Sequence, residues 1–252
     1  MPELPEVQTV VDHLNPRLSQ QIIQSVQVYY PAICYFKDCD TLLSGQQIQQ
    51  ISRRGKYIIF HCDTTNVIIH LRMEGKFYFQ DLKDPIHKHT HLSFIFNEFR
   101  CDFNDTRKFG RIDVTDDIDE FFKDRLGLEP FDENCSASYL KEKAKSRHIP
   151  LKTFILDQSV IAGIGNIYAD ESLFEAKISP FKACDKVTVA EYERLIIAIR
   201  KILRLALKDG GSTIKSFAVS HEINGLFQQH LQVYSRASKP CKVCGSILNK
   251  GR

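Results

Sequence analysis

The sequence lacks the features of a membrane-spanning, secreted or repetitive protein. No apolar run reaches the roughly 18–20 residues that a helix needs to cross a bilayer, and no basic segment followed by an apolar stretch opens the chain as a signal peptide would. The eight cysteines form no compact framework, so we expect reduced cysteines in a cytosolic protein. Internal repeats and low-complexity tracts are also lacking, which excludes a repeat array.

The composition is that of a folded protein with an uneven charge distribution. Hydrophobic residues make up 43% of the chain and charged residues 26%, which is enough apolar material for a core. Residues 1–130 carry 15 Lys and Arg against 19 Asp and Glu, a net charge of −4, whereas residues 131–252 carry 19 against 12, a net charge of +7. A basic half suggests contact with a polyanion, although variation between domains would explain the same difference.

Two kinds of local pattern divide the chain. Residues 5–18 have apolar side chains at helical spacing, and Pro5 suits the first turn. Short runs rich in β-branched and aromatic residues then predict strands at 22–30, 56–62, 67–73, 76–80, 91–96 and 100–103. Strands at this spacing are typical of a β-sandwich or barrel.

Helical patterns dominate the second half, at residues 119–126, 138–145, 151–158, 166–176 and 189–208. The last of these is the clearest, because Thr188 and Glu191 form a capping box and Gly210 follows the end. Residues 128–134, with Pro130, are typical of a linker. The predicted fold class is therefore α+β, with a β domain that begins with a helix and a helical, basic domain after it.

The N-terminus, Met-Pro-Glu, carries a candidate nucleophile. Removal of Met1 would expose the secondary amine of Pro2, and a terminal amine has a pKa near about 7.7–8.0, so much of it is unprotonated at neutral pH. Such an amine can attack a sugar C1′ and form an iminium that stays cationic and accepts electrons. Glu3 could protonate the ring oxygen O4′. The alternative is that Pro2 is only a processing signal.

Several segments, in this order along the chain, resemble the formamidopyrimidine-DNA glycosylase (Fpg/MutM) branch of the Fpg/Nei family. They are MPELPEV at residues 1–7, RRGKY at 53–57, HLRMEG at 70–75, KHTH at 88–91, DTRKFG at 105–110, GIGNIYA at 163–169 and LQVYSR at 231–236. The endonuclease VIII branch typically has Gly where this chain has Leu4. The resemblance covers nearly the whole chain.

The resemblance implies roles for residues that the local pattern leaves ambiguous. It makes Pro2 and Glu3 catalytic, together with Lys56, which assists base excision and strand cleavage. In isolation Lys56 would belong to a solvated basic cluster, although a compact ammonium also suits a phosphate or lesion-base contact.

The resemblance also makes Met73, Arg107 and Phe109 the wedge that fills the place of an everted nucleotide, with Arg107 donating to the orphaned cytosine. A lone methionine such as Met73 is usually a core residue, whereas an aromatic in a polar loop is harder to explain as core. Inserted apolar or guanidinium groups offset part of the cost of base flipping. Thr106 and Lys108 replace the Pro and the second Arg of the usual family loop, and we expect the Thr to loosen that loop.

The resemblance implies that His89, Arg147 and Asn166 bind DNA phosphates, with Asn166 in the turn of a helix–two-turn–helix. The glycines at 163 and 165 would let the backbone approach DNA, and helix N-terminal amides attract anions. For Arg147 the alternative is an exposed basic side chain, because residues 146–149 depart from the lysine-rich family segment. Residues 212–227 would form the loop that closes over a flipped 8-oxoguanine.

Cys241 and Cys244 look like the first half of a zinc β-hairpin. Zinc needs four ligands, and the family supplies a second C-x-x-C about twenty residues further on, whereas this chain stops at Arg252. Only two of the four ligands of the expected zinc ion are present, and His230 is a poor substitute. The family hairpin also carries a DNA-gripping arginine, so we expect weak or absent glycosylase activity from these residues and normal activity with the hairpin restored.

The predicted domains are an N-terminal catalytic β-sandwich at 1–130, a helix–two-turn–helix domain at 131–236 and a truncated zinc-finger segment at 237–252. The predicted function is a bifunctional DNA glycosylase and AP lyase. It would excise oxidised purines from duplex DNA and cleave by β,δ-elimination, as a monomer in a bacterial cytoplasm without membrane contact. Alternatives are an endonuclease VIII-like enzyme for oxidised pyrimidines, a non-catalytic lesion-binding remnant, and a relative that uses the helix–two-turn–helix to bind RNA or protein.

Overall fold

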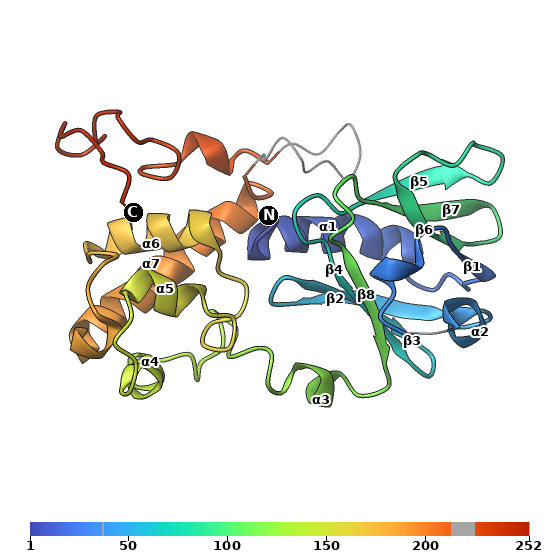
Figure 1. The fold of residues 1–252 in the computed structure, drawn as a ribbon, viewed down its shortest axis with the longest axis horizontal. Coiled ribbons are helices and arrows are strands. Elements are labelled where there is room, and N and C mark those ends of the chain that lie inside the picture. The colour runs from blue at the N-terminus through green and yellow to red at the C-terminus, as the bar shows by residue number, and fades with distance from the viewer. Residues whose placement is uncertain (37, 213–224, 252) are drawn as a thin grey trace. The chain divides into compact units, whose positions relative to one another are not determined.

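The computed structural model describes residues 1–36, 38–212 and 225–251, and the chain divides into two units (Figure 1). Unit 1 comprises Met1–Phe122 with Thr213–Gly225, and unit 2 comprises Lys123–Ser212 with Leu226–Arg252. The division into three segments, at 1–130, 131–236 and 237–252, stays a prediction. Among the described residues, no helix has both the length and the apolar character that crossing a bilayer requires.

Unit 1 contains two antiparallel four-stranded sheets. One has the order β1 (Ser25–Val28), β6 (Thr90–Ile95), β7 (Phe99–Asn104) and β5 (Lys76–Asp81), and the other has the order β2 (Ile48–Arg54), β3 (Tyr57–Cys62), β4 (Asn66–His70) and β8 (Arg111–Thr115). The sheets pack face to face, because the ring of Phe60 in β3 lies 6.1 Å from that of Phe77 and 5.4 Å from that of Phe94, both in the other sheet. The expected α+β class with a β-sandwich is confirmed.

Strands β2 and β8 were not predicted. In β2 only Ile48 and Ile51 are buried, and an irregularity between Ile48 and Gln50 interrupts the alternation that marks a strand. β8 combines one buried isoleucine, Ile112, with charged neighbours. Both strands depend on pairing partners distant in sequence, which a local pattern does not reveal.

Helix α1 (Leu4–Leu18) covers unit 1 with one apolar face. Val7, Val10 and Leu14 are buried in the common core, as the helical spacing predicts. The side-chain carbonyl of Asn15 accepts a 2.7 Å hydrogen bond from the Ile51 N–H of β2, which fixes the helix on the sheet edge. Unit 1 also contains the short helices η1 (Pro31–Ile33), α2 (Cys39–Leu43) and α3 (Ile118–Phe122).

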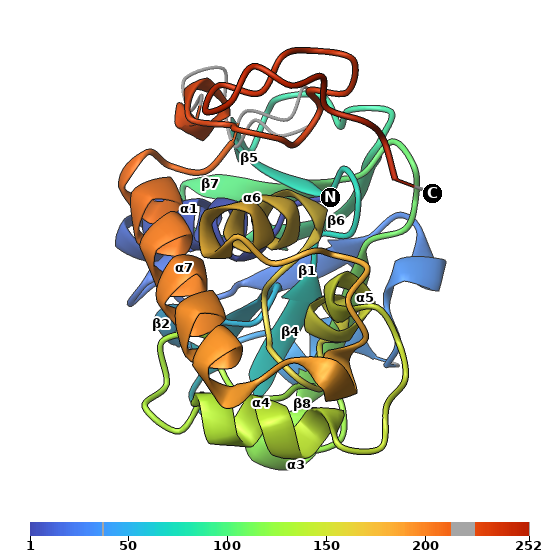
Figure 2. The same ribbon diagram turned by 90° about the vertical axis from the view of Figure 1, so that its left-hand side faces the viewer.

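Unit 2 is helical, with α4 (Ala137–Ala144), α5 (Leu151–Leu156), α6 (Asn166–Ala176), η2 (Cys184–Lys186), α7 (Val189–Lys208) and η3 (Phe227–Gln229). α6 and α7 lie side by side in both views (Figures 1 and 2). The predicted capping box at the start of α7 is confirmed, since the Thr188 hydroxyl accepts from Glu191 N–H and Glu191 accepts from Thr188 N–H. The helical positions of the second half follow the sequence pattern closely.

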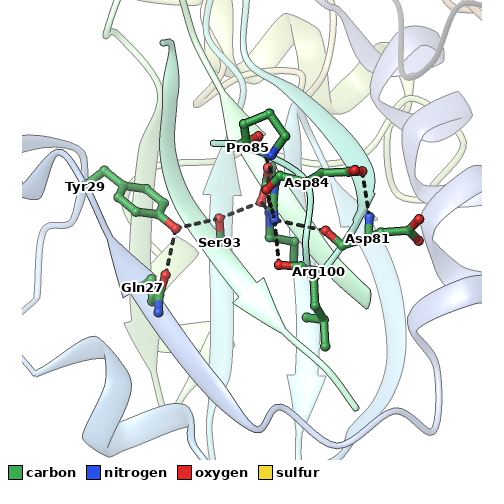
Figure 3. Close-up of polar contacts among 9 residues, drawn as sticks. Gln27, Tyr29, Asp81, Asp84, Pro85, Ser93 and Arg100 are labelled. Carbon is green, nitrogen blue, oxygen red and sulfur yellow. Dashed lines mark hydrogen bonds and ion pairs between the residues drawn. The ribbon is translucent and has the colours of Figure 1, made fainter. Parts of the chain in front are cut away.

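The buried side chain of Arg100 in unit 1 holds the loop that follows β5 (Figure 3). Arg100 Nε donates to both carboxylate oxygens of Asp102, at 3.0 and 3.1 Å, and both side chains are buried. The guanidinium also donates to the carbonyls of Asp81, Asp84 and Pro85 at 2.9–3.2 Å. The carboxylate accepts a 2.5 Å hydrogen bond from Ser93. Arg100 therefore fixes the backbone of residues 81–85, just before the segment that carries His89.

Candidate active site and nucleic-acid interface

The amino terminus lies at the start of α1, where Pro2 and Glu3 are both buried. Glu3 is the residue that caps α1, and it forms a reciprocal capping box with Glu6, whose carboxylate accepts a 2.9 Å hydrogen bond from Glu3 N–H. Burial lowers the pKa of the Met1 α-amine. Lys56 and Arg107 lower this pKa further, whereas Glu3 and Glu6 raise it. The terminal amine therefore shares one electrostatic environment with Glu3, Lys56 and Arg107.

Lys56 occupies the tight turn between β2 and β3, and its side chain is buried. Gly55 has a φ of 59°, which favours glycine, and its carbonyl accepts a 2.9 Å hydrogen bond from the Arg53 guanidinium. Burial lowers the pKa of the Lys56 ammonium, and the carboxylates of Glu3 and Glu6 act in the opposite direction. Lys56 is thus a desolvated amine near the chain terminus and is not part of a solvated basic cluster.

His70, at the end of β4, is a second buried titratable group near Lys56. Its ring packs edge-on against Tyr57 with centroids 4.6 Å apart, and its Nδ1 accepts a 2.9 Å hydrogen bond from Arg72 N–H. Burial, reinforced by the charges of Arg72, Lys56 and Arg111, lowers its pKa to about 3. His70 is therefore neutral at physiological pH, and sequence reasoning gave it no role although it opens the HLRMEG segment.

The 105–110 loop is organised by Asp105, a fully buried carboxylate. Asp105 accepts hydrogen bonds from the backbone N–H groups of Arg107 at 2.9 Å, Phe109 at 2.8 Å and Gly110 at 2.7 Å. The His91 ring holds the Asp105 carbonyl at 2.6 Å. A buried carboxylate with several donors fixes the backbone firmly, and this role of Asp105 was not predicted. These hydrogen bonds to Asp105 hold the loop, which the replacement of Pro by Thr106 was expected to loosen.

The predicted wedge residues sit at the ends of two loops of unit 1. Phe109 is 53% exposed, which is unusual for a phenylalanine and agrees with its predicted place outside the core. The Arg107 guanidinium lies 4.9 Å from the centroid of the Phe109 ring. Met73 is half-buried in the turn after β4, and the neighbouring Glu74 accepts a hydrogen bond from the Thr106 hydroxyl.

His89 is half-buried at the start of β6, and its carbonyl accepts a 3.0 Å hydrogen bond from Asp105 N–H. Its backbone is therefore joined to the loop that carries Arg107. All the predicted catalytic and wedge residues, together with His89, lie in unit 1, whereas Arg147 and Asn166 lie in unit 2.

The turn before α6 in unit 2 is held by Gln158. Its amide nitrogen donates to the carbonyls of Leu156 and Ile164 at 2.9 and 2.8 Å, and its amide oxygen accepts from Gly163 N–H at 2.9 Å. Gly163 has a φ of 91°, which explains the glycine. Asn166 is exposed at the first turn of α6, as an anion contact requires. Sequence reasoning missed Gln158, because its partners are set by the turn.

Arg147 lies near the same turn and forms an ion pair with Asp157 at 2.7 Å. The two side chains are 34% and 37% exposed, so the guanidinium reaches solvent beside its partner. Five N–H donors allow an arginine to bind two anions at once. The ion pair with Asp157 is therefore compatible with the predicted phosphate contact of Arg147 and also with the alternative of an exposed basic side chain.

The segment after residue 225 is anchored to α6 by Glu171. This buried carboxylate accepts hydrogen bonds from the backbone N–H groups of Gln232, Val233 and Tyr234 at 2.8–2.9 Å. The anchored segment leads to Cys241, which is buried, and Cys244, which is exposed. No disulfide joins the cysteine side chains that the structure describes.

The two cysteines do not by themselves fit a zinc ion. Val243 N–H donates to Cys241 Sγ at 3.4 Å, and hydrogen bonds from Ser246 lower the pKa of the Cys244 thiol. The described part of the chain holds no group of three or more His, Cys, Asp or Glu side chains suited to a metal. Tetrahedral zinc requires four ligands. The predicted lesion-capping loop, 212–227, lies outside the described residues between 213 and 224.

Residues 1–112 match the family model for the formamidopyrimidine-DNA glycosylase N-terminal domain, and residues 126–218 match that for the formamidopyrimidine-DNA glycosylase H2TH domain. The β-sandwich, with the chain terminus at the start of α1, corresponds to the first, and the turn before α6 that Gln158 holds lies in the second. Fold and site thus define a class, the DNA glycosylases that combine these two domains.

Proteins similar to this chain agree with this class. The formamidopyrimidine-DNA glycosylase of Oceanobacillus iheyensis is 40% identical over 99% of this chain and 92% of its own length. That of Ureaplasma parvum is 41% identical over 99% of this chain and 94% of its own. The chain therefore belongs to the formamidopyrimidine-DNA glycosylase family.

Solved structures show the same fold with DNA bound. A Lactococcus lactis Fpg mutant in complex with Fapy-dG-containing DNA superposes with a TM-score of 0.93 at 37% identity, covering 100% of this chain and 94% of that one. The wild-type Lactococcus lactis Fpg is also known with an oxidised-pyrimidine-containing DNA, at a TM-score of 0.91 and 36% identity, with coverage of 100% and 94%.

Proposed function

We propose that the protein is a bifunctional DNA glycosylase and AP lyase that excises oxidised purines from duplex DNA in base-excision repair. The observation that carries this proposal is the place of the chain terminus, where the Met1 amine, one residue before Pro2, shares an electrostatic environment with Glu3, Lys56 and Arg107. After Met1 is removed, the Pro2 amine would occupy this environment, in which burial favours the unprotonated, nucleophilic form, and the relatives act on formamidopyrimidine lesions by name. A monomer in a bacterial cytoplasm is the setting that we propose for this activity.

The proposed reaction begins when Met1 is removed and the Pro2 nitrogen attacks C1′ of the damaged nucleotide. The glycosidic bond breaks with its electron pair on the departing base, which takes up a proton, while Glu3 protonates O4′ and the sugar ring opens. The resulting iminium is an electron sink, so loss of a C2′ proton expels the 3′ phosphate and a second elimination expels the 5′ phosphate. Water then releases Pro2, and Lys56 serves as the proton carrier near the lesion base.

The proposed wedge consists of Met73, Arg107 and Phe109. Eversion of a base leaves a gap in the duplex and costs a few kcal/mol. The exposed Phe109 ring stacks in that gap, and Arg107, held beside the ring, donates hydrogen bonds to the orphaned cytosine. This contact would favour lesions that lie opposite cytosine.

The DNA backbone is bound, in this proposal, by His89 of unit 1 and by Arg147 and Asn166 of unit 2. Asn166 is exposed at the N-terminus of α6, where backbone N–H groups and the helix dipole attract a phosphate. Arg147 contributes charge. Sequence-independent contacts of this kind fix the register of the duplex while the wedge probes the bases.

Zinc is proposed only as an ion to which Cys241 and Cys244 contribute two ligands, in keeping with the family. The reaction above uses no step at this ion. Zinc content of the purified protein, measured by mass spectrometry with metal analysis, tests the assignment. Cys241→Ser/Cys244→Ser should abolish any bound zinc, whereas Cys135→Ser should not change it.

Borohydride trapping tests the central claim. The protein, incubated with an 8-oxoguanine:C duplex and borohydride, should form a covalent DNA adduct, because reduction converts the iminium to a stable amine. A matched fusion that leaves extra residues in front of Pro2 converts its nitrogen to an amide and should form none. Trapping of both proteins to the same extent would refute the proposal.

Oxidised pyrimidines are a second candidate substrate class, because one relative is known with such a DNA bound. Competition between 8-oxoguanine and thymine-glycol duplexes distinguishes the two. Preferred cleavage of 8-oxoguanine opposite cytosine is expected from the Arg107 contact. A preference for thymine glycol would place the chain with the pyrimidine-directed enzymes.

A further inference from the structure

The two loops that carry the wedge residues emerge side by side from one end of a strand pair. β5 and β7 are paired so that Lys76 lies opposite Asn104. The turn at residues 72–75 therefore precedes β5 next to the point where the 105–110 loop leaves β7. Met73 lies in the first loop, and Arg107 and Phe109 lie in the second.

Both loops rest on the same buried ring. A Cβ atom at Gly75 would lie 2.9 Å from Cζ of Phe103, and a Cβ atom at Gly110 would lie 2.6 Å from the same atom. Only glycine permits this close approach at each position. Phe103 is fully buried, and both loops pack against its ring where they join the sheet.

The outer parts of the two loops are joined by a side-chain hydrogen bond. The Thr106 hydroxyl donates to Oε2 of Glu74, the residue after Met73. Within the second loop, the Asp105 carboxylate accepts hydrogen bonds from the N–H groups of Arg107 and Phe109, which follow Thr106 in the chain. A proline at position 106, as in the usual family loop, has no side-chain donor and could not form this contact.

We propose that Thr106 and Glu74 are positioning residues that lock the two loops into one wedge. The hydrogen bond fixes Met73 relative to Arg107 and Phe109, so that the three side chains enter the duplex together. This inference rests on the proposed function for its catalytic consequence. Thr106, which was expected to loosen the 105–110 loop, instead joins this loop to the turn at residues 72–75.

Single-turnover kinetics with four variants test the catalytic consequence. Thr106→Val removes the hydroxyl with little change in shape and should slow excision of 8-oxoguanine opposite cytosine about three- to tenfold, the effect of one lost hydrogen bond. Thr106→Ser keeps the donor and Glu74→Gln keeps an acceptor oxygen, so both should stay within about twofold. Thr64→Val, at an exposed threonine in the β3–β4 turn, is the matched control.

The substrate separates positioning from general damage to the protein. An abasic duplex has no lesion base to evert, so its cleavage by Thr106→Val should match that by the unmodified chain within about twofold. A loss shared equally by both substrates would show that the variant disturbs the fold or the chemistry, and an unchanged excision rate would show that the hydrogen bond has no role. Either result overturns the proposal.

Hydrogen exchange of the DNA-free protein tests the contact independently of any activity. Thr106→Val should speed amide exchange both within residues 105–110 and across residues 72–75, whereas Thr64→Val should affect neither loop. Faster exchange confined to 105–110 would overturn the coupling of the two loops. A chain that cleaves no damaged duplex but shows the coupled exchange would refute the proposed function and leave the loop contact established.

Discussion

At the scale of single residues, the site contains titratable groups whose charged forms are destabilised by burial. The terminal amine and Lys56 both have lowered pKa values, chiefly because they are desolvated. Glu3 and Glu6 oppose this effect at both groups and limit it. A lowered pKa enlarges the unprotonated fraction of each amine, which is the form that nucleophilic attack and proton acceptance require.

His70 makes the stability of unit 1 sensitive to acid. Its pKa in the folded state is about 3, against 6.5 for an ordinary histidine, so below pH 6.5 the unfolded chain binds the additional proton. Stability from this group is present above pH 6.5 and is lost as the pH falls toward 3. Between pH 7 and pH 4 we expect its contribution to the free energy of unfolding to fall by roughly 3 kcal/mol.

Denaturant titrations at several pH values check this expectation. His70→Gln should unfold at lower denaturant concentration at pH 7 but should lose much less stability on acidification than the unmodified chain. His87→Gln, at an exposed histidine, should retain the full pH dependence. Identical pH slopes for the unmodified chain and His70→Gln would exclude His70 as the source.

At the scale of elements, the helices were predictable and two strands were not. α1 and α7 display apolar residues at helical spacing with recognisable first turns, so local sequence determines them. β2 and β8 acquire their role from distant partners, β3 and β4, and carry few buried side chains of their own. Pairing energy comes from contacts that no local window contains.

The site shows the same division between local and distant information. Motif similarity indicated Pro2, Lys56, Arg107 and Phe109, whose types suit a chemical role. It did not indicate the groups that hold them, such as Asp105, because each acts through backbone N–H donors chosen by the folded loop. Gln158 in unit 2 was missed for the same reason. These supporting contacts depend on the conformation of the folded loop, which the residue types alone do not reveal.

The Arg100–Asp102 pair should contribute more to stability than any exposed pair of unit 1. Asp102→Asn leaves the Arg100 charge buried with a weaker partner, so we expect a loss of about 3–5 kcal/mol in the free energy of unfolding. Asp119→Asn breaks the exposed pair with Arg54 and should cost less than about 1 kcal/mol. Urea unfolding of the two variants measures the difference, and similar losses would contradict the argument.

Glu171 should determine how firmly the segment after residue 225 is held on α6. Glu171→Gln replaces one acceptor oxygen with an amide donor, so the N–H groups of Gln232, Val233 and Tyr234 cannot all remain bonded. We expect amide exchange there to accelerate about tenfold or more. Glu175→Gln on the same helix removes only an exposed pair with Lys201 and serves as the control. Unchanged exchange in Glu171→Gln would show that other contacts hold the segment.

At the scale of the whole molecule, the residues proposed for catalysis and the excess of positive charge lie in different units. The residues proposed for catalysis and for the wedge lie in unit 1. Residues 131–252, to which most of unit 2 belongs, have a net charge of +7. Charge attracts the DNA backbone without regard to sequence. This separation explains how an acidic half can act on DNA, since most of the electrostatic attraction arises from the other unit.

The salt dependence of DNA binding distinguishes the roles proposed for Arg147 and Asn166. Each phosphate neutralised by a cation contributes about −0.9 to the slope of log K against log salt. Arg147→Gln should therefore reduce the magnitude of the slope by about 0.9, provided that its guanidinium binds a phosphate beside Asp157. Asn166→Ala removes a neutral contact at the helix N-terminus and should weaken binding with the slope unchanged. If Arg147→Gln leaves the slope as it was, the guanidinium belongs to the Asp157 pair alone, and the phosphate contacts of unit 2 must come from other cations.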